Sequence, residues 1–106
     1  MSREKKSMAT VNYWYDPGTG IWEEHDGGKT WILVVPDGSR YQWDAREAYA
    51  TVNSDDLVRS ATYEKAKWWL EQMREAGEKG GNQTGDRYPR VNGPCLTPPP
   101  GEADGR

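Results

Sequence analysis

His25 is the only histidine and Cys95 the only cysteine, so few side chains could act as a nucleophile, general base or metal ligand. His25 follows Glu23 and Glu24 and precedes Asp26, at the end of a predicted strand. Consecutive strand residues point to opposite faces, which limits how well these four side chains could chelate a divalent ion. Cys95 lies in a Pro- and Gly-rich segment, where an activated thiol is not expected. We therefore expect that the chain is not an enzyme and that it binds neither a metal ion nor a cofactor.

Tryptophan and tyrosine are the remaining side chains that could recognise a ligand, and the chain has six of each and no phenylalanine. Each can bury roughly 150–250 Å², and each keeps a polar group that suits a half-exposed position. A small domain cannot bury all of them, and a contiguous exposed group would mark a binding surface. The predicted binding residues are Trp14, Trp22, Trp68, Tyr15, Glu23 and Glu24.

Four strands, joined in pairs by turns rich in Gly, Pro and Asp, are predicted in the first part of the chain. Asp16-Pro-Gly-Thr-Gly20 and Asp26-Gly27-Gly28 form the first two turns, and Pro36-Asp-Gly38 forms the third. Along the first strand, alternation places Tyr13 and Tyr15 on one face and Trp14 on the other. The predicted strands are residues 11–15, 21–25 and 30–35, and a fourth through Tyr41 and Trp43.

The third turn decides which side chains share a face of the last hairpin. A type I turn through residues 36–37, followed by Gly38 in the left-handed conformation, gives each residue its preferred geometry. This turn opposes Trp31 to Trp43, whereas a two-residue turn at 37–38 would oppose Ile32 to Trp43. We favour the first register because it gathers the aromatic residues. One face would then carry Trp31, Leu33, Val35, Tyr41 and Trp43.

Two helices are predicted after the hairpins. Asp44 and Glu47 have the spacing of a capping box, followed by a short helix to Val52. A longer helix is predicted from Ser54 to Glu78, with a break near residues 60–62 left open, and Gly77 or Gly80-Gly81 ends it. Its apolar stripe should pack on the sheet. The stripe is Ala66, Trp69, Leu70, Met73 and Ala76, and the predicted aromatic core is Trp31, Trp43, Tyr41 and Trp69.

The sequence thus predicts an α+β fold: a small four-stranded antiparallel sheet of two hairpins, then a short helix and a longer amphipathic C-terminal helix on one sheet face. Residues 1–9 are expected to be a flexible arm and residues 10–79 a single domain. Residues 80–106 are rich in Gly and Pro and have few apolar side chains to offset the entropy of ordering, so a disordered tail is expected.

Charge and hydropathy narrow the range of partners. Residues 9–79 carry 8 basic and 13 acidic side chains, so direct binding to a nucleic-acid backbone is not expected. No apolar run reaches the roughly 18 residues needed to cross a bilayer, and no secretory signal is recognisable, so a cytoplasmic location is expected. An exposed edge strand, the first or the fourth, offers a route to a homodimer.

The pattern Trp14-Tyr-Asp-Pro17, Trp22 and Asp26-Gly-Gly-Lys-Thr-Trp31 resembles short Trp-rich β modules such as the WW domain. The likeness covers residues 14–31 only. The hairpin loops are short, and the proline expected just after the second Trp is missing. No ligand and no binding residue is inferred from it.

The expected function is that of a small non-enzymatic protein-interaction domain, an adaptor or inhibitor of the kind found among bacterial or phage accessory proteins. It would bind another protein through exposed Trp and Tyr side chains on an acidic domain. Two alternatives stay open. One is a small-ligand or carbohydrate-binding module that stacks on aromatic rings; the other is a nucleic-acid-related protein, either a single-strand binder or an acidic mimic of DNA.

Overall fold

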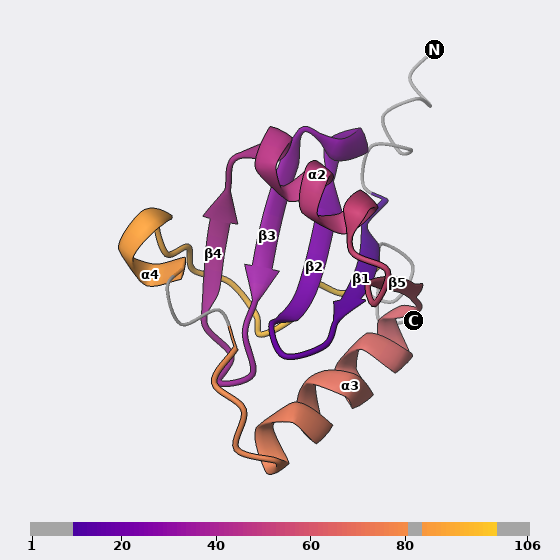
Figure 1. Cartoon of the computed structure of the whole chain (residues 1–106), viewed down its shortest axis with the longest axis vertical. Helices are drawn as coiled ribbons and strands as arrows, with labels where there is room; N and C mark the ends of the chain where they lie inside the picture. Colours follow the sequence, from indigo (N-terminus) through magenta and orange to yellow (C-terminus); the bar gives the residue numbers. More distant parts are fainter. Residues whose placement is uncertain (1–9, 81–83, 100–106) are drawn as a thin grey trace.

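The computed structural model describes residues 10–80 and 84–99, which form one antiparallel sheet with helices on both faces (Figure 1). The strands are β1 (Asn12–Asp16), β2 (Gly20–His25), β3 (Thr30–Val34), β4 (Arg40–Trp43) and β5 (Arg59–Ala61), in the order β4-β3-β2-β1-β5. The helical segments are η1 (Asp26–Gly28), α2 (Ala45–Ser54), α3 (Tyr63–Glu75) and α4 (Thr84–Arg87). The α+β class is confirmed, but the sheet has five strands rather than four.

The additional strand, β5, replaces the beginning of the predicted long helix. It pairs with β1 in antiparallel register, with Ala61 opposite Tyr13. The helix starts only at Tyr63, because the side chain of Thr62 caps it by accepting a hydrogen bond from the Lys65 N–H at 3.1 Å. The break left open near residues 60–62 is therefore a strand. It also places β1 inside the sheet, so the expectation of an edge at the first strand was wrong.

Removing the Thr62 cap provides a local test of this boundary. Thr62→Ala should lower the free energy of unfolding by about 1 kcal/mol, because one N–H of the first turn of α3 loses its partner. Thr62→Ser keeps the hydroxyl and should lose clearly less. Urea unfolding followed by circular dichroism measures both variants. Equal losses would show that the hydroxyl is not the group that stabilises the start of α3.

The predicted register of the last hairpin is confirmed. Trp31 lies opposite Trp43 in the β3–β4 pairing. Gly38 has φ 94°, and its N–H donates to the Val35 carbonyl at 2.8 Å, as expected when a left-handed residue follows a type I turn. The turn chemistry of residues 36–38 therefore determines which side chains of β3 and β4 face each other.

Hydrophobic side chains form two clusters, one on each sheet face. Both faces of β3 are apolar, so each needs a cover. Under α2 lie Trp22, Trp31, Leu33, Val35, Ala48 and Val52, with Trp14, Tyr41 and Trp43 at their margin. Facing α3 lie Tyr13, Ile21, Ile32, Val34, Ala66, Leu70 and Leu96, with Tyr15 and Trp69 at their margin. The expectation of one aromatic core that includes Trp69 was therefore wrong, because α2 and α3 cover opposite faces.

The predicted C-terminal end of α3 is confirmed, whereas the predicted N-terminal cap of α2 is not formed. α3 ends as predicted at Gly77, whose φ is 80°, and the Glu78 N–H donates to the Met73 carbonyl at 3.0 Å. Asp44 occupies the N-cap position of α2 but makes no side-chain cap hydrogen bond. Glu47 does not reach back to it and contacts the Tyr88 hydroxyl instead. The capping box is therefore not formed.

Residues 88–97, here called the C-terminal strap, pack on the sheet. The Gln42 N–H donates to the Pro89 carbonyl and the Val91 N–H to the Arg40 carbonyl, each at 2.9 Å, so the strap pairs with β4. Its trace passes behind the sheet in Figure 1. The side chain of Leu96 is only 5% exposed.

Residues 84–99 are thus ordered, contrary to the predicted disorder of residues 80–106. Average composition failed there because a few side chains provide the attachment: Tyr88 stacks on Trp43 with ring centroids 4.2 Å apart, and Leu96 enters the α3-side cluster. The remaining parts of the expected arm and tail, residues 1–9, 81–83 and 100–106, lie outside the described residues.

Candidate functional site

Two of the predicted binding residues are buried in the domain. Trp22 is 1% exposed, and its Nε1 donates to Asp16 Oδ2 at 3.0 Å. Glu23 is 0% exposed and pairs with Arg40 at 3.3 Å. Neither side chain can touch a partner in this fold, so both are withdrawn as binding residues. The error has one cause: β2 is covered on both faces, whereas the prediction left one face bare.

Trp14 and Glu24 form a separate half-buried pair. The indole Nε1 of Trp14 donates to Glu24 Oε1 at 3.2 Å. Trp14 packs at the margin of the α2-side cluster and Tyr15 at the margin of the α3-side cluster, which confirms the predicted alternation along β1. The indole N–H of Trp14 is already bonded to Glu24 Oε1, which also accepts from the Asn12 side chain at 3.4 Å, so this N–H is not available to a partner.

The remaining two predicted residues, Tyr15 and Trp68, each contact Trp69 of α3. Tyr15 and Trp69 stack with ring centroids 4.1 Å apart and planes 9° from parallel. Trp68 meets Trp69 edge to face at 4.7 Å. Lys65 Nζ lies 4.3 Å from the Trp68 centroid and 5.0 Å from that of Trp69. We call these four residues the aromatic flank of α3. Tyr15 and Trp68 were predicted binding residues, whereas the contributions of Lys65 and Trp69 to this surface were not predicted.

Helical geometry explains why the flank is half exposed. Ala66, Leu70 and Met73 are buried and fix the side of α3 that faces the sheet. Trp69 lies at the edge of that side, and Trp68 lies about 100° further round the helix, towards water. Trp68 is 46% exposed as a result. Its spacing from Lys65 is i, i+3, which could have signalled this contact in the sequence.

Charges of both signs surround the base of the flank. Burial raises the pKa of Tyr15, and the negative charge of Glu78 raises it further, while Arg59 acts in the opposite direction. The phenol is therefore neutral at physiological pH, with its hydroxyl proton in place. Lys65 has no ion-pair partner within the part of the chain that the structure describes. The flank thus offers an indole, a phenol and one unpaired ammonium group.

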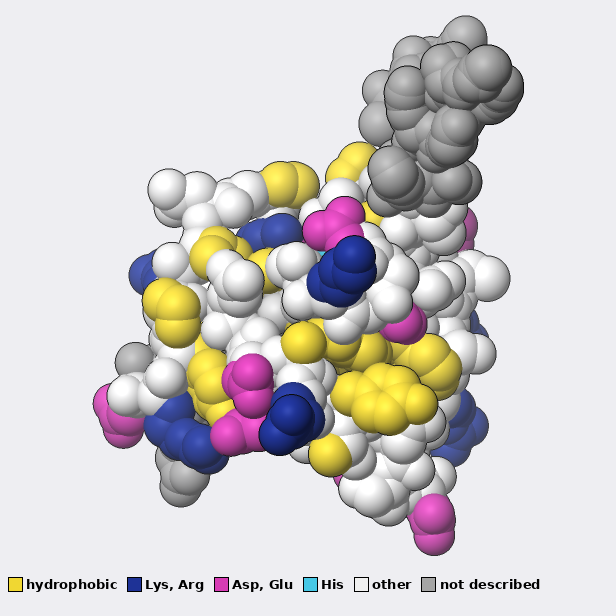
Figure 2. Space-filling model, turned by 90° about the horizontal axis from the view of Figure 1, so that it is seen from above, with side chains coloured by type: hydrophobic (Ala, Val, Ile, Leu, Met, Phe, Trp, Pro, Cys, Tyr) yellow, Lys and Arg dark blue, Asp and Glu magenta, His cyan; other side chains and the backbone are white. Residues whose placement is uncertain are grey.

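Among the described residues, the two other large hydrophobic side chains that are mostly exposed make no aromatic ring contact. Tyr49 is 61% exposed and Leu57 57% exposed. Figure 2 looks onto the end of the molecule that is uppermost in Figure 1, and shows hydrophobic side chains interspersed with both basic and acidic ones. The two signs of charge are mixed on this face, so it does not form the continuous basic area that a nucleic-acid backbone would need.

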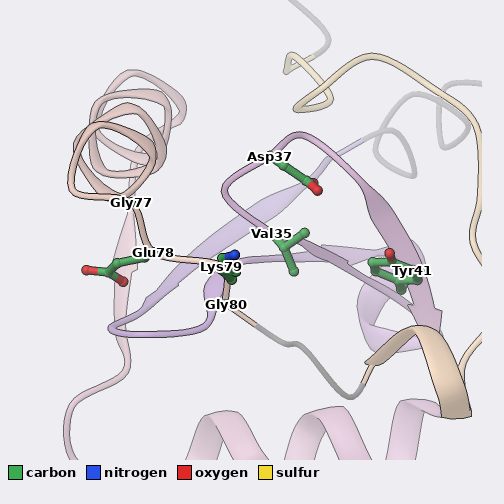
Figure 3. Close-up of a pocket in the computed structure, with 7 residues that line it drawn as sticks. All are labelled: Val35, Asp37, Tyr41, Gly77, Glu78, Lys79 and Gly80. Carbon is green, nitrogen blue, oxygen red and sulfur yellow. The ribbon is translucent and has the colours of Figure 1, made fainter.

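The described surface includes two grooves that do not gather a reactive set of side chains. One, of about 440 Å³, is lined by Val35, Asp37, Tyr41 and residues 77–80. In Figure 3, Glu78 points away from Val35 and Tyr41. The Asp37 carboxylate already accepts a hydrogen bond from the Ser39 N–H at 2.8 Å. The other, of about 350 Å³, is lined by Tyr63, Lys67, Leu70, Glu71, Arg74, Pro94, Cys95 and Leu96.

The chemistry of these grooves is limited. Burial raises the pKa of the Cys95 thiol, which keeps it protonated and weakly nucleophilic. Within residues 10–80 and 84–99, no group of three or more His, Cys, Asp or Glu side chains could hold a metal ion. Among the described helices, none has the length and apolar content to span a bilayer.

Comparison with known proteins gives no identification, because no family model, no curated protein and no solved structure matches this chain significantly.

Proposed function

We propose that this chain is a small, non-enzymatic protein-interaction domain and that the aromatic flank of α3 is its recognition surface. The observation that carries the proposal is Trp68, an indole 46% exposed to water and held by Trp69 and Lys65. A tryptophan fixed in this way loses little conformational entropy on binding. Exposed Trp side chains that insert into a partner's pocket commonly contribute most of the binding free energy.

The same contacts favour a protein partner over a sugar. Stacking a sugar ring requires a free aromatic face, and the ammonium group of Lys65 lies 4.3 Å from the centroid of Trp68. A partner protein can approach the exposed edge of the indole and present a carboxylate or carbonyl to Lys65 at the same time. The exposed part of Trp68 amounts to roughly 100 Å² of a side chain that buries up to about 250 Å². We therefore expect the partner to provide a pocket for the Trp68 side chain.

Trp68→Ala should weaken partner binding at least about 30-fold, the factor that corresponds to a loss of about 2 kcal/mol at a dominant interface residue. The measurement is quantitative capture from lysate by the immobilised full chain, followed by titration of the captured protein against the wild type and the variant. The thermal unfolding midpoint of the variant should fall only slightly, because Trp68 contributes one edge contact and one cation–π contact to the fold.

Tyr49→Ala is the matched control. Tyr49 is also an exposed aromatic residue on a helix, but it lies on α2, away from the flank. The Tyr49→Ala variant should capture the partner protein as well as the wild type does. Capture that survives Trp68→Ala, or is lost equally in both variants, would remove the basis of the proposal. A Trp fluorescence response to a glycan panel that disappears in Trp68→Ala would instead support the carbohydrate alternative.

A further inference from the structure

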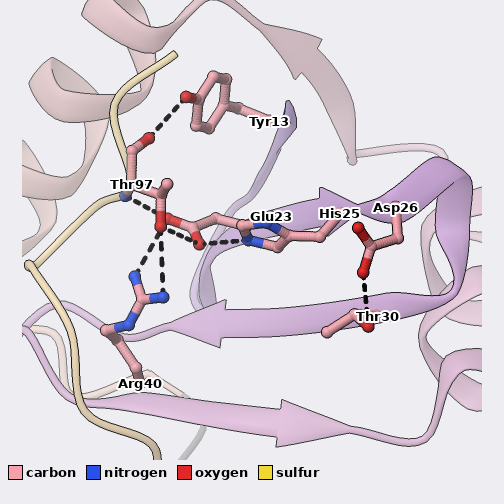
Figure 4. Close-up of polar contacts among 7 residues, drawn as sticks. All are labelled: Tyr13, Glu23, His25, Asp26, Thr30, Arg40 and Thr97. Atoms are coloured by element: carbon pink, nitrogen blue, oxygen red, sulfur yellow. Dashed lines mark hydrogen bonds and ion pairs between the residues drawn. The ribbon is translucent and has the colours of Figure 1, made fainter. Parts of the chain in front are cut away.

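One residue of the C-terminal strap, Thr97, is bound through every polar group it has (Figure 4). Its N–H donates to Glu23 Oε2 at 2.7 Å and its hydroxyl to Glu23 Oε1 at 3.0 Å. Its carbonyl accepts from the Tyr13 hydroxyl at 2.6 Å. Its hydroxyl also accepts from Arg40 Nη2 at 3.3 Å. Three side chains from three different strands therefore converge on a single residue that follows them by more than fifty positions in the sequence.

The groups that hold Thr97 are themselves positioned and buried. Glu23 is 0% exposed, and His25 Nε2 lies 2.9 Å from its Oε1 while Arg40 Nη1 lies 3.3 Å from its Oε2. A buried ion pair of this kind adds little to stability compared with apolar residues of the same volume. Arg40 Nε is also buried without a hydrogen-bond partner among the described residues. The arrangement is therefore better explained by recognition of a specific segment than by stabilisation of the sheet.

The neighbouring strap residues fit the same surface in shape. Leu96, directly before Thr97, is 5% exposed and packs in the α3-side cluster with Ile32 and Leu70. Gly93 has φ 149°, and a Cβ at this position would lie 3.0 Å from Arg40 Nε. The sheet and α3 thus provide an apolar pocket for an aliphatic side chain next to a polar pocket for a threonine, and the strap backbone lies close to Arg40 at Gly93.

We infer that Tyr13, Glu23 and Arg40, with the adjoining apolar pocket, form a binding site for an extended segment that carries an aliphatic residue followed by threonine. The chain's own Leu96–Thr97 occupies this site as an intramolecular ligand. A partner segment of the same chemistry binds there when the strap is displaced, by pairing along β4 as the strap does. This site is separate from the aromatic flank of α3, and the inference does not depend on the function proposed for that flank.

Peptide binding in trans tests this inference. The receptor is the full chain with Leu96→Ser and Thr97→Ala, which weakens the internal ligand and leaves the site unchanged. The probe is a fluorescently labelled synthetic peptide of residues 88–99 with Cys95→Ser. We expect saturable binding by anisotropy and an unfolding temperature that rises with peptide concentration. The matched peptide with Thr97→Val keeps the shape of the side chain but lacks the hydroxyl. It should bind at least about tenfold more weakly, because a hydrogen bond to a charged group is lost.

The receptor with Thr97→Ala alone is a milder second variant, used if circular dichroism shows the double variant to be unfolded. Absence of binding to a folded receptor would overturn the inference. Equal affinity for the peptide that keeps Thr97 and for its matched Thr97→Val peptide would also overturn it. Unfolding of both receptors would show that the site does not exist without the strap, which is equally incompatible with a preformed binding site.

Discussion

Glu23→Gln is expected to lower the free energy of unfolding by about 3–5 kcal/mol, the loss typical of breaking a buried ion pair from one side. Glutamine has nearly the same shape, so packing is not the reason. The charge of Arg40 remains buried without its counter-charge, 3.3 Å from the substituted group. The Thr97 N–H also exchanges a carboxylate acceptor for a neutral one or for an amide nitrogen. Urea unfolding at neutral pH measures the change.

The pKa of Glu23 determines how the destabilisation by Glu23→Gln changes with pH. Burial alone would raise the pKa of Glu23, but hydrogen bonds from His25 and the Thr97 N–H and the charge of Arg40 outweigh it, so its pKa lies below the ordinary value of 4.5. A lowered folded-state pKa adds stability above about pH 4.5, and this contribution is lost as the pH falls through the folded-state value. Glu23→Gln should therefore be least harmful in acid, and its difference from the wild type should grow towards neutral pH.

Glu24→Gln is the matched control, because Glu24 is the next residue and is partly exposed, and its carboxylate accepts hydrogen bonds only from the neutral side chains of Trp14 at 3.2 Å and Asn12 at 3.4 Å among the described residues. It should change the free energy of unfolding by less than about 1 kcal/mol. A Glu23→Gln variant as stable as Glu24→Gln, or a stability difference that does not depend on pH, would show that the Glu23 network contributes little to holding the strap.

Trp22→Ala is expected to destabilise the domain by about 3–5 kcal/mol, as is typical when a large buried aromatic side chain is removed. Trp22 is 1% exposed and contacts Trp31 and Trp43 edge to face, with centroids 6.3 and 4.7 Å away. Its removal also leaves the buried carboxyl of Asp16 without the indole N–H at 3.0 Å. Thermal or urea unfolding measures the loss.

Trp68→Ala is the internal comparison for this result, because the two substitutions remove the same side chain from a buried and from an exposed position. Its loss should be at most about 1 kcal/mol. If the two variants proved equally stable, the division between a core tryptophan and a surface tryptophan would be wrong. In that case Trp22 would again be a candidate for contact with a partner.

The hairpins were predictable because the information that determines them is local. The turn at residues 36–38 contains one residue suited to each of its positions, and this fixed the pairing of Trp31 with Trp43 before any tertiary contact was considered. The i, i+3, i+4 pattern of α3 likewise identified its buried side, with Leu70 and Met73 facing the sheet and Trp68 facing water. The exposure of Trp68 on the aromatic flank of α3 follows from this pattern.

The missed features depend on distant partners. β5 has the sequence Arg-Ser-Ala, which carries no strand signal, and it pairs only because β1 offers an edge. Glu23 and Trp22 were predicted to be exposed because the strap and α2, which cover them, could not be placed from the sequence. The strap itself has an average composition typical of disorder, although Tyr88 and Leu96 bind surfaces formed by residues far away in the chain.

The position of the strap also has a consequence for biosynthesis. The bond between Glu23 and the Thr97 N–H joins residues that are 74 positions apart. A nascent chain therefore makes the β1–β2 and β3–β4 hairpins early, while Glu23 and Arg40 stay uncovered until Thr97 has left the ribosome. During this interval the unpaired edge of β4 is open to other nascent chains. Slower translation of the segment between α3 and the strap should lengthen the interval and increase aggregation.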